Sequence, residues 1–454
     1  MDLQYVVEAN QMQFWLQKML QDQVSGDLKL RVVDGYYKLN IDGMTGSLFI
    51  DRENILCPTT FAVTSRIHKR KFSVDVSNFL EDDFIFLEKV SSAPLFEEGR
   101  PSEYFLVPKI LDYIFWMVNR IEEYSVERIL DSHYRYNVES SIAYKYKFID
   151  RPIVDEYIWL LKALVLHIWP SAVLKDTEYE FRLSCDIDHP FLSGRSRLSV
   201  YKQAAGNLLR GYGLFSSLDD LYLFEKCRIF GYSHDPFFRG IQEVSRLADK
   251  SDLNATFFLL LDTTSVKYDG IVNVDSDKYV TLIKSLFNSG HLIGIHPGYF
   301  CDDDHLFLRA ISKFDELVKN FGGSQLPLVS RMHYLRFDIK TYLRQVKVMN
   351  IVEDHSLGYT EVMGFRSGTA RPFCLYNMQN GDTSETIFYP LHIMDHSILQ
   401  GRNRDSDVRK ALNHAEKIKR RVQFYGGILS VLWHNSSLNT IVERRAFDSL
   451  LDIR

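Results

Sequence analysis

The sequence predicts an α/β protein in which a smaller α/β region precedes a larger region built on a parallel sheet or barrel. Three observations support this prediction. In residues 176–454, strand-like and helix-like segments alternate, which is typical of parallel sheets covered by helices. Most of these strand-like segments end in polar or ionisable side chains. Residues 1–175 instead mix short strand-like segments with helical ones such as KILDYIFWMVNRIEEY.

Length, composition and net charge limit the classes of protein to which this chain could belong. With 454 residues, the chain is long enough for two or three domains with a large core. It is 46% hydrophobic and 25% charged, as ordinary globular proteins are, and its net charge of −5 argues against nucleic acid as a partner. The aromatic content of 13% would suit a surface that stacks on sugars, although large α/β cores are also rich in Phe.

Segments that direct a chain to a membrane are not predicted. The start, MDLQYVVEANQMQFWLQ, has acidic residues early and no cationic segment before an apolar one, unlike a signal peptide. The most apolar window, YIWLLKALVLHIWP, contains Lys162 and His167 and is too short to span a bilayer. The five cysteines form no CxxC pair, so neither a disulfide framework nor a zinc knuckle is expected. We therefore expect a cytoplasmic protein without a transmembrane segment.

The elements follow one another in a regular order. In the first region, SGDLKL and KLRVVDGYYKLNI are strand-like. In the second, FRLSCDID, ATFFLLLD, HLIGIH, RMHYLRF, YPLHIMD and ILSVLWHN are strand-like, and helical stretches such as DKYVTLIKSLFNSG separate them. The segment from residue 190 to 252 is longer than an ordinary connection, and we expect either a lid over the site or an extra helical hairpin. The ionisable strand ends are Asp186, Asp188, Asp262, His296, Asp354, Asp395 and His434.

Four of these strand-end residues indicate chemistry. Asp186 and Asp188 are two apart on a strand, so their side chains point to the same side. Such a pair can simply cap the next helix, and a lone histidine is more often a satisfied core residue than a ligand. Together with His296 and His434 from other strands, however, the pair supplies the metal ligands, the base and the acid that a hydrolytic site needs.

The order and wording of these segments resemble the NodB-homology polysaccharide deacetylases, the fourth carbohydrate-esterase family. SCDIDHP, ATFFLLLD, GHLIGIH, RMHY, EDHSLGY and LSVLWHN stand in the order of that family's motifs. The residues within these motifs are similar to those of a branch that carries an extra N-terminal domain. The resemblance implies an irregular (β/α) barrel of the glycoside hydrolase/deacetylase type over residues 176–454, preceded by a smaller α/β domain of unknown role over residues 1–175.

The resemblance also implies an activity and a set of roles. The activity is the metal-dependent removal of the N-acetyl group from an amino sugar in a polysaccharide or its precursor, with a glycan or sugar-containing molecule as the partner. The implied roles are Asp186 as catalytic base, Asp188 and His296 as metal ligands, Arg331 as the group that orients the base, Asp354 as the carboxylate that tunes the acid, and His434 as that acid.

One departure from the family concerns the metal. The family's second metal histidine, four residues after the first, is Phe300 here. Catalytic zinc takes three protein ligands, so Asp188 and His296 alone would hold it poorly. His333, which replaces a proline of the family, is our leading candidate for the third ligand of a divalent metal, expected to be zinc. The other candidates are His189, His355 and the acidic run 302–304. The alternative function is a catalytically inactive carbohydrate-binding or assembly protein on the same fold.

Two further residues are candidates for substrate binding. In GFRSGTARPF, Arg366 could bind a substrate carboxylate or phosphate, could pair with Asp186 in place of Arg331, or could brace the loop. Trp433 is part of the sequence WHN, which stands where the family commonly ends its motif in HD. It is a second candidate for contact with the sugar.

Overall fold

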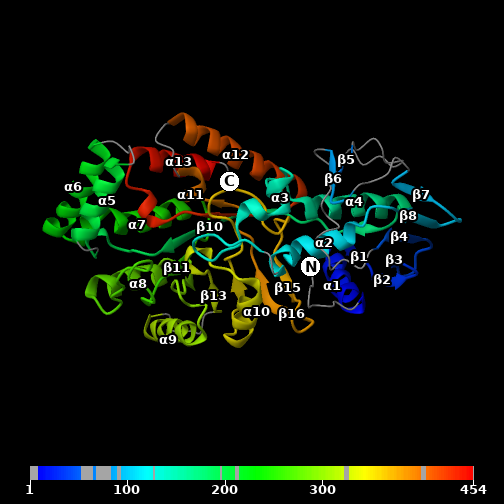
Figure 1. Ribbon diagram of the computed structural model, residues 1–454, viewed down its shortest axis with the longest axis horizontal. Helices are drawn as coiled ribbons and strands as arrows, with labels where there is room; N and C mark the ends of the chain where they lie inside the picture. Colours follow the sequence, from blue (N-terminus) through cyan, green and yellow to red (C-terminus); the bar gives the residue numbers. More distant parts are fainter. Residues whose placement is uncertain are drawn as a thin grey trace.

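Two sheets organise the chain in the computed structural model (Figure 1). The smaller one lies in the N-terminal region and the larger one, which carries the strand-end residues, lies in the second region. The structure describes residues 9–52, 65–67, 83–88, 94–125, 128–194, 197–209, 214–321, 327–399 and 405–452.

The N-terminal sheet has five strands in the order β2-β3-β4-β8-β7. Alternate residues of β3 (Tyr37, Leu39, Ile41) are buried, as expected for a sheet with one face on the core. Asp34 and Gly35, both with positive φ, make the tight turn between β2 and β3. The strands of the N-terminal region are β1 (Val24–Ser25), β2 (Leu28–Val33), β3 (Tyr36–Ile41), β4 (Ser47–Asp51), β5 (Ser65–Ile67), β6 (Phe84–Phe86), β7 (Phe96–Glu98) and β8 (Glu103–Leu106), of which β1, β5 and β6 lie outside this sheet.

The large sheet has nine strands in the order β15-β16-β14-β13-β12-β11-β10-β18-β17. All neighbours pair in parallel except β15 and β16. The strands are β10 (Tyr179–Ile187), β11 (Thr256–Leu259), β12 (Leu292–Ile295), β13 (Val329–Ser330), β14 (Glu353–Asp354), β15 (Phe373–Asn377), β16 (Asp382–Phe388), β17 (Ile393–Met394) and β18 (Gly427–Leu432). β11, β12 and β18 are largely apolar and are buried along most of their length, as the strands of a parallel sheet covered on both faces are. β10 also carries polar residues and is buried from Leu183 to its end.

Helices lie on both sides of the large sheet. Figure 1 shows α8, α9 and α10 on one side and α12 and α13 on the other. The helices are α1 (Ala9–Gln21), α2 (Ile110–Val118), α3 (Ile142–Lys145), α4 (Ile153–Ile168), α5 (Arg197–Leu209), α6 (Leu214–Phe230), α7 (Pro236–Lys250), α8 (Asp277–Asn288), α9 (Asp304–Phe321), α10 (Ile339–Val348), α11 (Asp395–Leu399), α12 (Asp405–Tyr425) and α13 (Ile441–Asp452).

The predicted mixed α/β class is confirmed, but a closed barrel is not formed. The edge strands of this sheet are β15 and β17, and no pairing between them closes the sheet into a ring among the described strands. β17 is two residues long and runs directly into α11 at Asp395, so it offers little backbone for a further ladder. The sheet is therefore open on that side.

The two regions share a hydrophobic core. One continuous cluster of buried residues runs from Met12 of α1 to Leu451 of α13. The indole Nε1 of Trp15 donates to the carbonyl of Cys374 (3.0 Å), and that of Trp159 donates to the carbonyl of Tyr425 (2.8 Å). β9 (Val173–Leu174), next to the expected boundary, pairs with β1 of the N-terminal region. The chain thus passes between the regions without an extended linker.

The long segment between β10 and β11 folds as helices. α5 and α6 pack together at one end of the molecule, at the far left of Figure 1. A small hydrophobic cluster, separate from the main core, joins them to residues before α5 and at the start of α7, and it is formed by Leu192, Val200, Phe224, Cys227 and Phe237. α7 instead packs against β10 and the main core. Of the two alternatives for this segment, the structure shows the helical hairpin.

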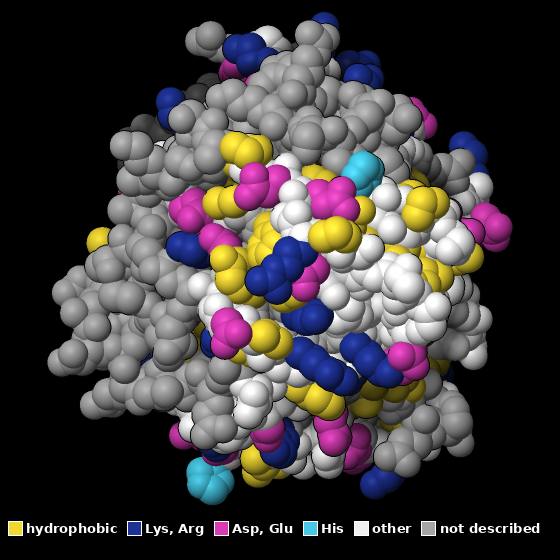
Figure 2. All heavy atoms as spheres, turned by 90° about the vertical axis from the view of Figure 1, so that its right-hand side faces the viewer, with side chains coloured by type: hydrophobic (Ala, Val, Ile, Leu, Met, Phe, Trp, Pro, Cys, Tyr) yellow, Lys and Arg dark blue, Asp and Glu magenta, His cyan; other side chains and the backbone are white. Residues whose placement is uncertain are grey.

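Three further observations concern membrane-spanning helices, surface charge and the cysteines. None of the described helices is both long and apolar enough to cross a membrane. At the end of the molecule formed by the N-terminal sheet, described Lys and Arg side chains lie among acidic and hydrophobic ones, so neither sign of charge dominates there (Figure 2). Cys185, Cys227, Cys301 and Cys374 are free thiols, and Cys57 lies outside the described residues.

Candidate metal centre

The carboxyl ends of β10, β12, β13 and β18 gather the predicted site residues. Asp186 is the last residue but one of β10 and is paired with Phe258 of β11, and Asp188 follows directly after the strand. His296 follows β12, and His434 lies two residues beyond β18. Because parallel strands end at the same edge of a sheet, residues far apart in sequence line one cavity of about 840 Å³.

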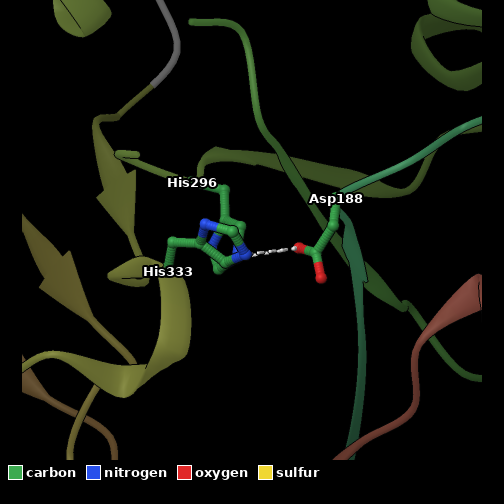
Figure 3. A group of neighbouring side chains, drawn as sticks. All are labelled: Asp188, His296 and His333. Atoms are coloured by element: carbon green, nitrogen blue, oxygen red, sulfur yellow. Dashed lines mark ion pairs between the residues drawn. The ribbon is translucent and has the colours of Figure 1, made fainter. Parts of the chain in front are cut away.

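Asp188, His296 and His333 form a group that could hold a metal ion (Figure 3). Their ligand atoms all lie within 4.8 Å of one another. The Oδ1 atom of Asp188 is 3.1 Å from Nε2 of His296 and 3.7 Å from Nε2 of His333. Figure 3 shows the two rings converging on this carboxylate. One carboxylate and two imidazoles are a suitable three-ligand set for catalytic zinc.

Hydrogen bonds fix which nitrogen each imidazole turns toward this group. Nδ1 of His296 donates to the carbonyl of Arg331 (2.6 Å), and Nδ1 of His333 donates to Oδ1 of Asp269 (2.8 Å). Both Nε2 atoms are therefore directed toward Asp188. Such bonds to the far nitrogen orient metal-binding histidines.

Two buried atoms of the group lack a hydrogen bond. Nε2 of His296 and Oδ1 of Asp188 are 3.1 Å apart, but their geometry is not that of a hydrogen bond, and neither has another partner. Buried polar atoms almost always have a hydrogen-bond partner, so two neighbouring buried atoms without one require an explanation. A divalent cation between them would satisfy both atoms, and the donor set fits one.

Asp269 contacts His333 on the side away from Asp188 and is itself held by several hydrogen bonds. Its Oδ2 accepts hydrogen bonds from the backbone of Thr264 and Ser265 and from the Thr264 hydroxyl, and its Oδ1 accepts one from the Tyr299 amide. Burial would raise the pKa of Asp269, but the hydrogen bonds from His333 and Thr264 lower it to about 2. Burial would likewise lower the pKa of His333, but Asp188 and Asp269 raise it to about 9. Without a metal, a proton therefore occupies the metal-facing side of His333.

Asp186 and Arg331 form a buried ion pair beside the metal group. Nη1 of Arg331 donates to Oδ1 of Asp186 (2.8 Å) and to the hydroxyl of Ser184 (2.9 Å). The guanidinium lies over the ring of Phe258, 4.3 Å from its centre. The other carboxylate oxygen of Asp186 is 3.8 Å from Nε2 of His296. Asp186 thus has one oxygen held by a cation and the other directed toward the metal group.

His434 faces the metal group from β18 and is paired with Asp395. Nδ1 of His434 lies 2.9 Å from Oδ1 of Asp395, whose Oδ2 accepts from the His434 amide (3.0 Å). Nε2 of His434 lies 3.8 Å from Oδ2 of Asp188. Burial would lower the pKa of His434, but Asp395 and the two strand-end carboxylates raise it to about 10. In the metal-free protein this imidazole is a charged proton donor.

The role expected for Asp354 is wrong, because a different carboxylate contacts His434. Asp354 accepts hydrogen bonds from the hydroxyls of Tyr342 (2.6 Å) and Ser356 (2.8 Å). It is fully buried at the end of β14, several strands away from β18 in the sheet. Burial raises its pKa to about 6, although these hydrogen bonds oppose the shift. Asp395, which directly follows β17, occupies the position beside His434 because β17 pairs with β18.

The two expected substrate-binding residues do not reach the cavity. Arg366 is 2% exposed, and its guanidinium donates to both carboxylate oxygens of Glu123 (3.0 and 2.8 Å). It therefore joins the two regions, which is the bracing alternative. Trp433 is fully buried, donates to the carbonyl of Ser437 and packs on the ring of Phe447. Neither residue lines the cavity, so both expectations of substrate contact are corrected.

The other candidates for the third ligand are not part of the three-residue group. His355 stacks on Tyr389, and burial lowers its pKa to about 4. In the acidic run, Asp302 pairs with Arg336, Asp303 accepts from amides at the start of α9, and Asp304 pairs with Arg344. His189 lines the cavity but is not part of the three-residue group. Phe300 is 41% exposed. Asp262, another strand end, pairs with Arg309 and Lys313.

Sequence reasoning missed several residues of the site. Asp269 lies in the stretch between β11 and α8 and carries no strand-end signal. Asp395 had that signal but was given no role. His133 and Arg135, from the N-terminal region, also line the cavity, and nothing in their local sequence indicates this.

Comparison with known proteins gives few matches. A model of a family of unknown function (DUF7033) matches residues 10–170. None of the curated proteins matches. Among solved structures, a protein described as a candidate polysaccharide deacetylase from Mycobacterium smegmatis is 12% identical, with a TM-score of 0.39 over 61% of this chain and 84% of that chain. A candidate polysaccharide deacetylase from Bordetella bronchiseptica, described as involved in O-antigen biosynthesis, is 14% identical, with a TM-score of 0.24 over 46% of this chain and 72% of that chain. With TM-scores this low, the chemistry of the site rests on its own residues.

Proposed function

We propose that the protein is a metal-dependent hydrolase that removes the N-acetyl group from an amino sugar in a polysaccharide or its precursor. The observation that carries the proposal is one shared cavity. It brings together the group Asp188, His296 and His333, the base candidate Asp186 and the acid candidate His434. These are the parts that hydrolysis of an amide needs, and the ordered motifs of the sequence resemble a deacetylase family.

A divalent metal, proposed to be zinc, would be held by Asp188 and by the Nε2 atoms of His296 and His333. When bound, it would supply a Lewis acid that polarises the acetyl carbonyl and makes water a better nucleophile at neutral pH. The neighbouring side chains would do the remaining work, which is to move protons and to orient the reacting groups.

Asp186 is the proposed general base. Its hydrogen bond from Arg331 fixes one of its two carboxylate oxygens. The other oxygen is turned toward the metal group, 3.8 Å from Nε2 of His296. A water attacking the acetyl carbon from this side would lie within reach of that free oxygen, as a general base requires.

His434 is the proposed general acid. An amide hydrolyses only if the departing amine receives a proton, because an amide anion is a very poor leaving group. The pairing of Nδ1 with Asp395 leaves Nε2 as the nitrogen that faces the cavity and can deliver the proton. Asp395 also stabilises the charged imidazole before the transfer. Asp186 and His434 thus approach the metal group from different strands, with opposite roles.

The two-domain description of the chain belongs to this proposal. We propose that residues 176–454 form the catalytic domain, an incompletely closed barrel of the deacetylase type, and residues 1–175 a domain packed on it. The parallel order from β10 to β14, continued on the other side by β18 and β17, supports the barrel-like arrangement. The separate five-stranded sheet supports the division.

The test is acetate release by the full chain loaded with zinc. N-acetylhexosamine oligosaccharides are the substrates, and acetate is measured by a coupled enzymatic assay. Asp186→Asn should lower acetate release by about a hundredfold or more while the protein keeps its zinc. His333→Ala should lose stoichiometric zinc, whereas His355→Gln, a buried histidine outside the group, should keep it. Glycan binding without acetate release by the zinc-loaded protein would instead favour a carbohydrate-binding protein.

A further inference from the structure

A loop of the N-terminal region forms one wall of the cavity. Asp131, His133 and Arg135 line the same space as Asp186 and His434. The loop is closed by a β-bridge between residues 130 and 136. Within it, Oδ1 of Asp131 accepts hydrogen bonds from the amides of His133 (2.8 Å) and Arg135 (3.0 Å). These bonds hold the loop in a defined shape, so its cavity-facing side chains have fixed positions.

Arg135 connects this loop to the turn that carries the third metal ligand. Its Nη1 donates to the carbonyl of Tyr334 (3.0 Å), the residue directly after His333. Tyr334 and Leu335 have φ values of +61° and +51°, a conformation that side chains other than glycine rarely adopt. A turn of this kind persists only when its surroundings hold it. Arg336 adds a second connection, because its Nε donates to the carbonyl of His133 (3.1 Å).

The cavity side of the loop joins an aromatic surface. The ring of His133 lies 4.7 Å from that of Tyr334 and 5.8 Å from that of Tyr268, and its Nδ1 lies 3.1 Å from the hydroxyl of Tyr299. Tyr268 stacks on Tyr299 with 3.8 Å between ring centres. His133, Tyr268 and Tyr334 are all partly exposed. Half-exposed rings with polar edges can contact the apolar face of a sugar and hydrogen-bond its hydroxyls.

The charges of this wall are already paired. Arg135 lies 2.6 Å from Asp131 and 2.7 Å from Glu361, and Arg336 pairs with Asp302 (3.0 Å). Burial and the nearby Arg135 lower the pKa of His133, so its imidazole is neutral at neutral pH. A wall of neutral rings and internally paired ions suits uncharged sugar units better than phosphate or carboxylate groups.

We propose that the loop of residues 131–135 is a sugar-recognition element of this active site. His133 contacts the sugar unit next to the one that loses its acetyl group, and Arg135 is a positioning residue for the turn of His333. This assigns the N-terminal region a part in the site, and it rests on the proposed function.

The test uses the zinc-loaded full chain with an N-acetylhexosamine and its oligosaccharides. His133→Ala should raise KM for the oligosaccharides by about tenfold, the usual effect of one lost contact, and should raise KM for the monosaccharide less, at equal zinc content. Arg135→Met and the milder Arg135→Lys should both lower zinc affinity, by about tenfold or more for the former. Arg128→Met is the matched control, because Arg128 also crosses between the regions, to Asp338, without lining the cavity.

Each part of the proposal can be overturned separately. An unchanged KM for oligosaccharides in His133→Ala would remove the recognition role, and unchanged zinc affinity in both folded Arg135 variants would remove the positioning role. If the unaltered protein releases no acetate, the proposed function fails while the loop can still be judged. Calorimetric titration with the same oligosaccharides would then have to show about tenfold weaker binding for His133→Ala. Equal binding would overturn the recognition role.

Discussion

His333 and Asp269 are joined by a hydrogen bond of 2.8 Å between Nδ1 and Oδ1. This bond turns the other nitrogen of His333 toward Asp188, and it anchors a candidate metal ligand that lies on a short 3-10 helix rather than on a strand. Asp269 is itself fixed by the Thr264, Ser265 and Tyr299 amides. The ligand is thus oriented through a chain of contacts that begins in the loop after β11.

Replacing Asp269 should weaken metal binding. Asp269→Ala is expected to lower zinc affinity by about 10–100-fold, because the imidazole of His333 loses the partner that orients it and raises its basicity. Competition with a chromophoric chelator measures the change. Asp262→Asn is the control, since Asp262 is a nearby buried carboxylate that pairs with Arg309 and Lys313 outside the group. Equal losses in the two variants would mean that the effect is general destabilisation.

Zinc affinity should rise with pH up to about 9. In the metal-free protein the pKa of His333 is about 9, so below that pH a proton must leave before the imidazole can bind the metal. One competing proton changes the apparent affinity by about tenfold per pH unit. Affinities measured across this range, with proton release followed by calorimetry in buffers of different ionisation enthalpy, would check it. A flat profile would show that His333 is neutral at the outset.

The stability of the metal-free protein should fall as pH rises above neutrality. The pKa of His434 is raised to about 10 in the folded state, from an ordinary value of 6.5, so the folded state binds this proton more tightly than the unfolded chain. The stabilisation is complete below about pH 6.5 and is lost as pH approaches 10. Urea unfolding in the presence of a chelator measures it. His434→Gln should flatten the dependence, leaving the smaller part that His333 contributes.

Removing Arg366 should affect stability and leave substrate binding unchanged. Arg366→Met is expected to lower the free energy of unfolding by about 3 kcal/mol, at the low end for a broken buried pair because Arg120 still pairs with Glu123. Arg246→Met, which breaks an exposed pair with Glu243, should cost about 1 kcal/mol or less. Thermal or urea unfolding compares the two. A raised KM in folded Arg366→Met would restore the substrate-binding interpretation.

Much of the site could be predicted because it depends on local signals. β10, β12 and β18 are apolar runs that end in Asp186, His296 and His434, and parallel strands bring such ends to one edge. His333 was predicted for a different reason, because it replaces a proline of the family that the sequence resembles; in the structure it follows β13 of the same sheet.

The remaining assignments depend on which strands are neighbours. Asp354 ends one short strand and Asp395 follows another, and only the pairing of β17 with β18 brings Asp395 to His434. Strand order is a long-range property that no local pattern encodes. Arg366 was misjudged for another reason. The glycines around it indicate an exposed turn, but Gly364 approaches the backbone of Ile149 so closely that a Cβ atom would lie 2.3 Å from its carbonyl oxygen. The turn is instead buried between the regions.

The shared hydrophobic core has a consequence for how the molecule gains and loses its structure. Because α1 and α4 contact the backbone of the second region through Trp15 and Trp159, cutting the chain near residue 175 would expose apolar surface on both fragments. Calorimetry should accordingly record one cooperative melting event for the intact chain, and each half expressed alone should aggregate.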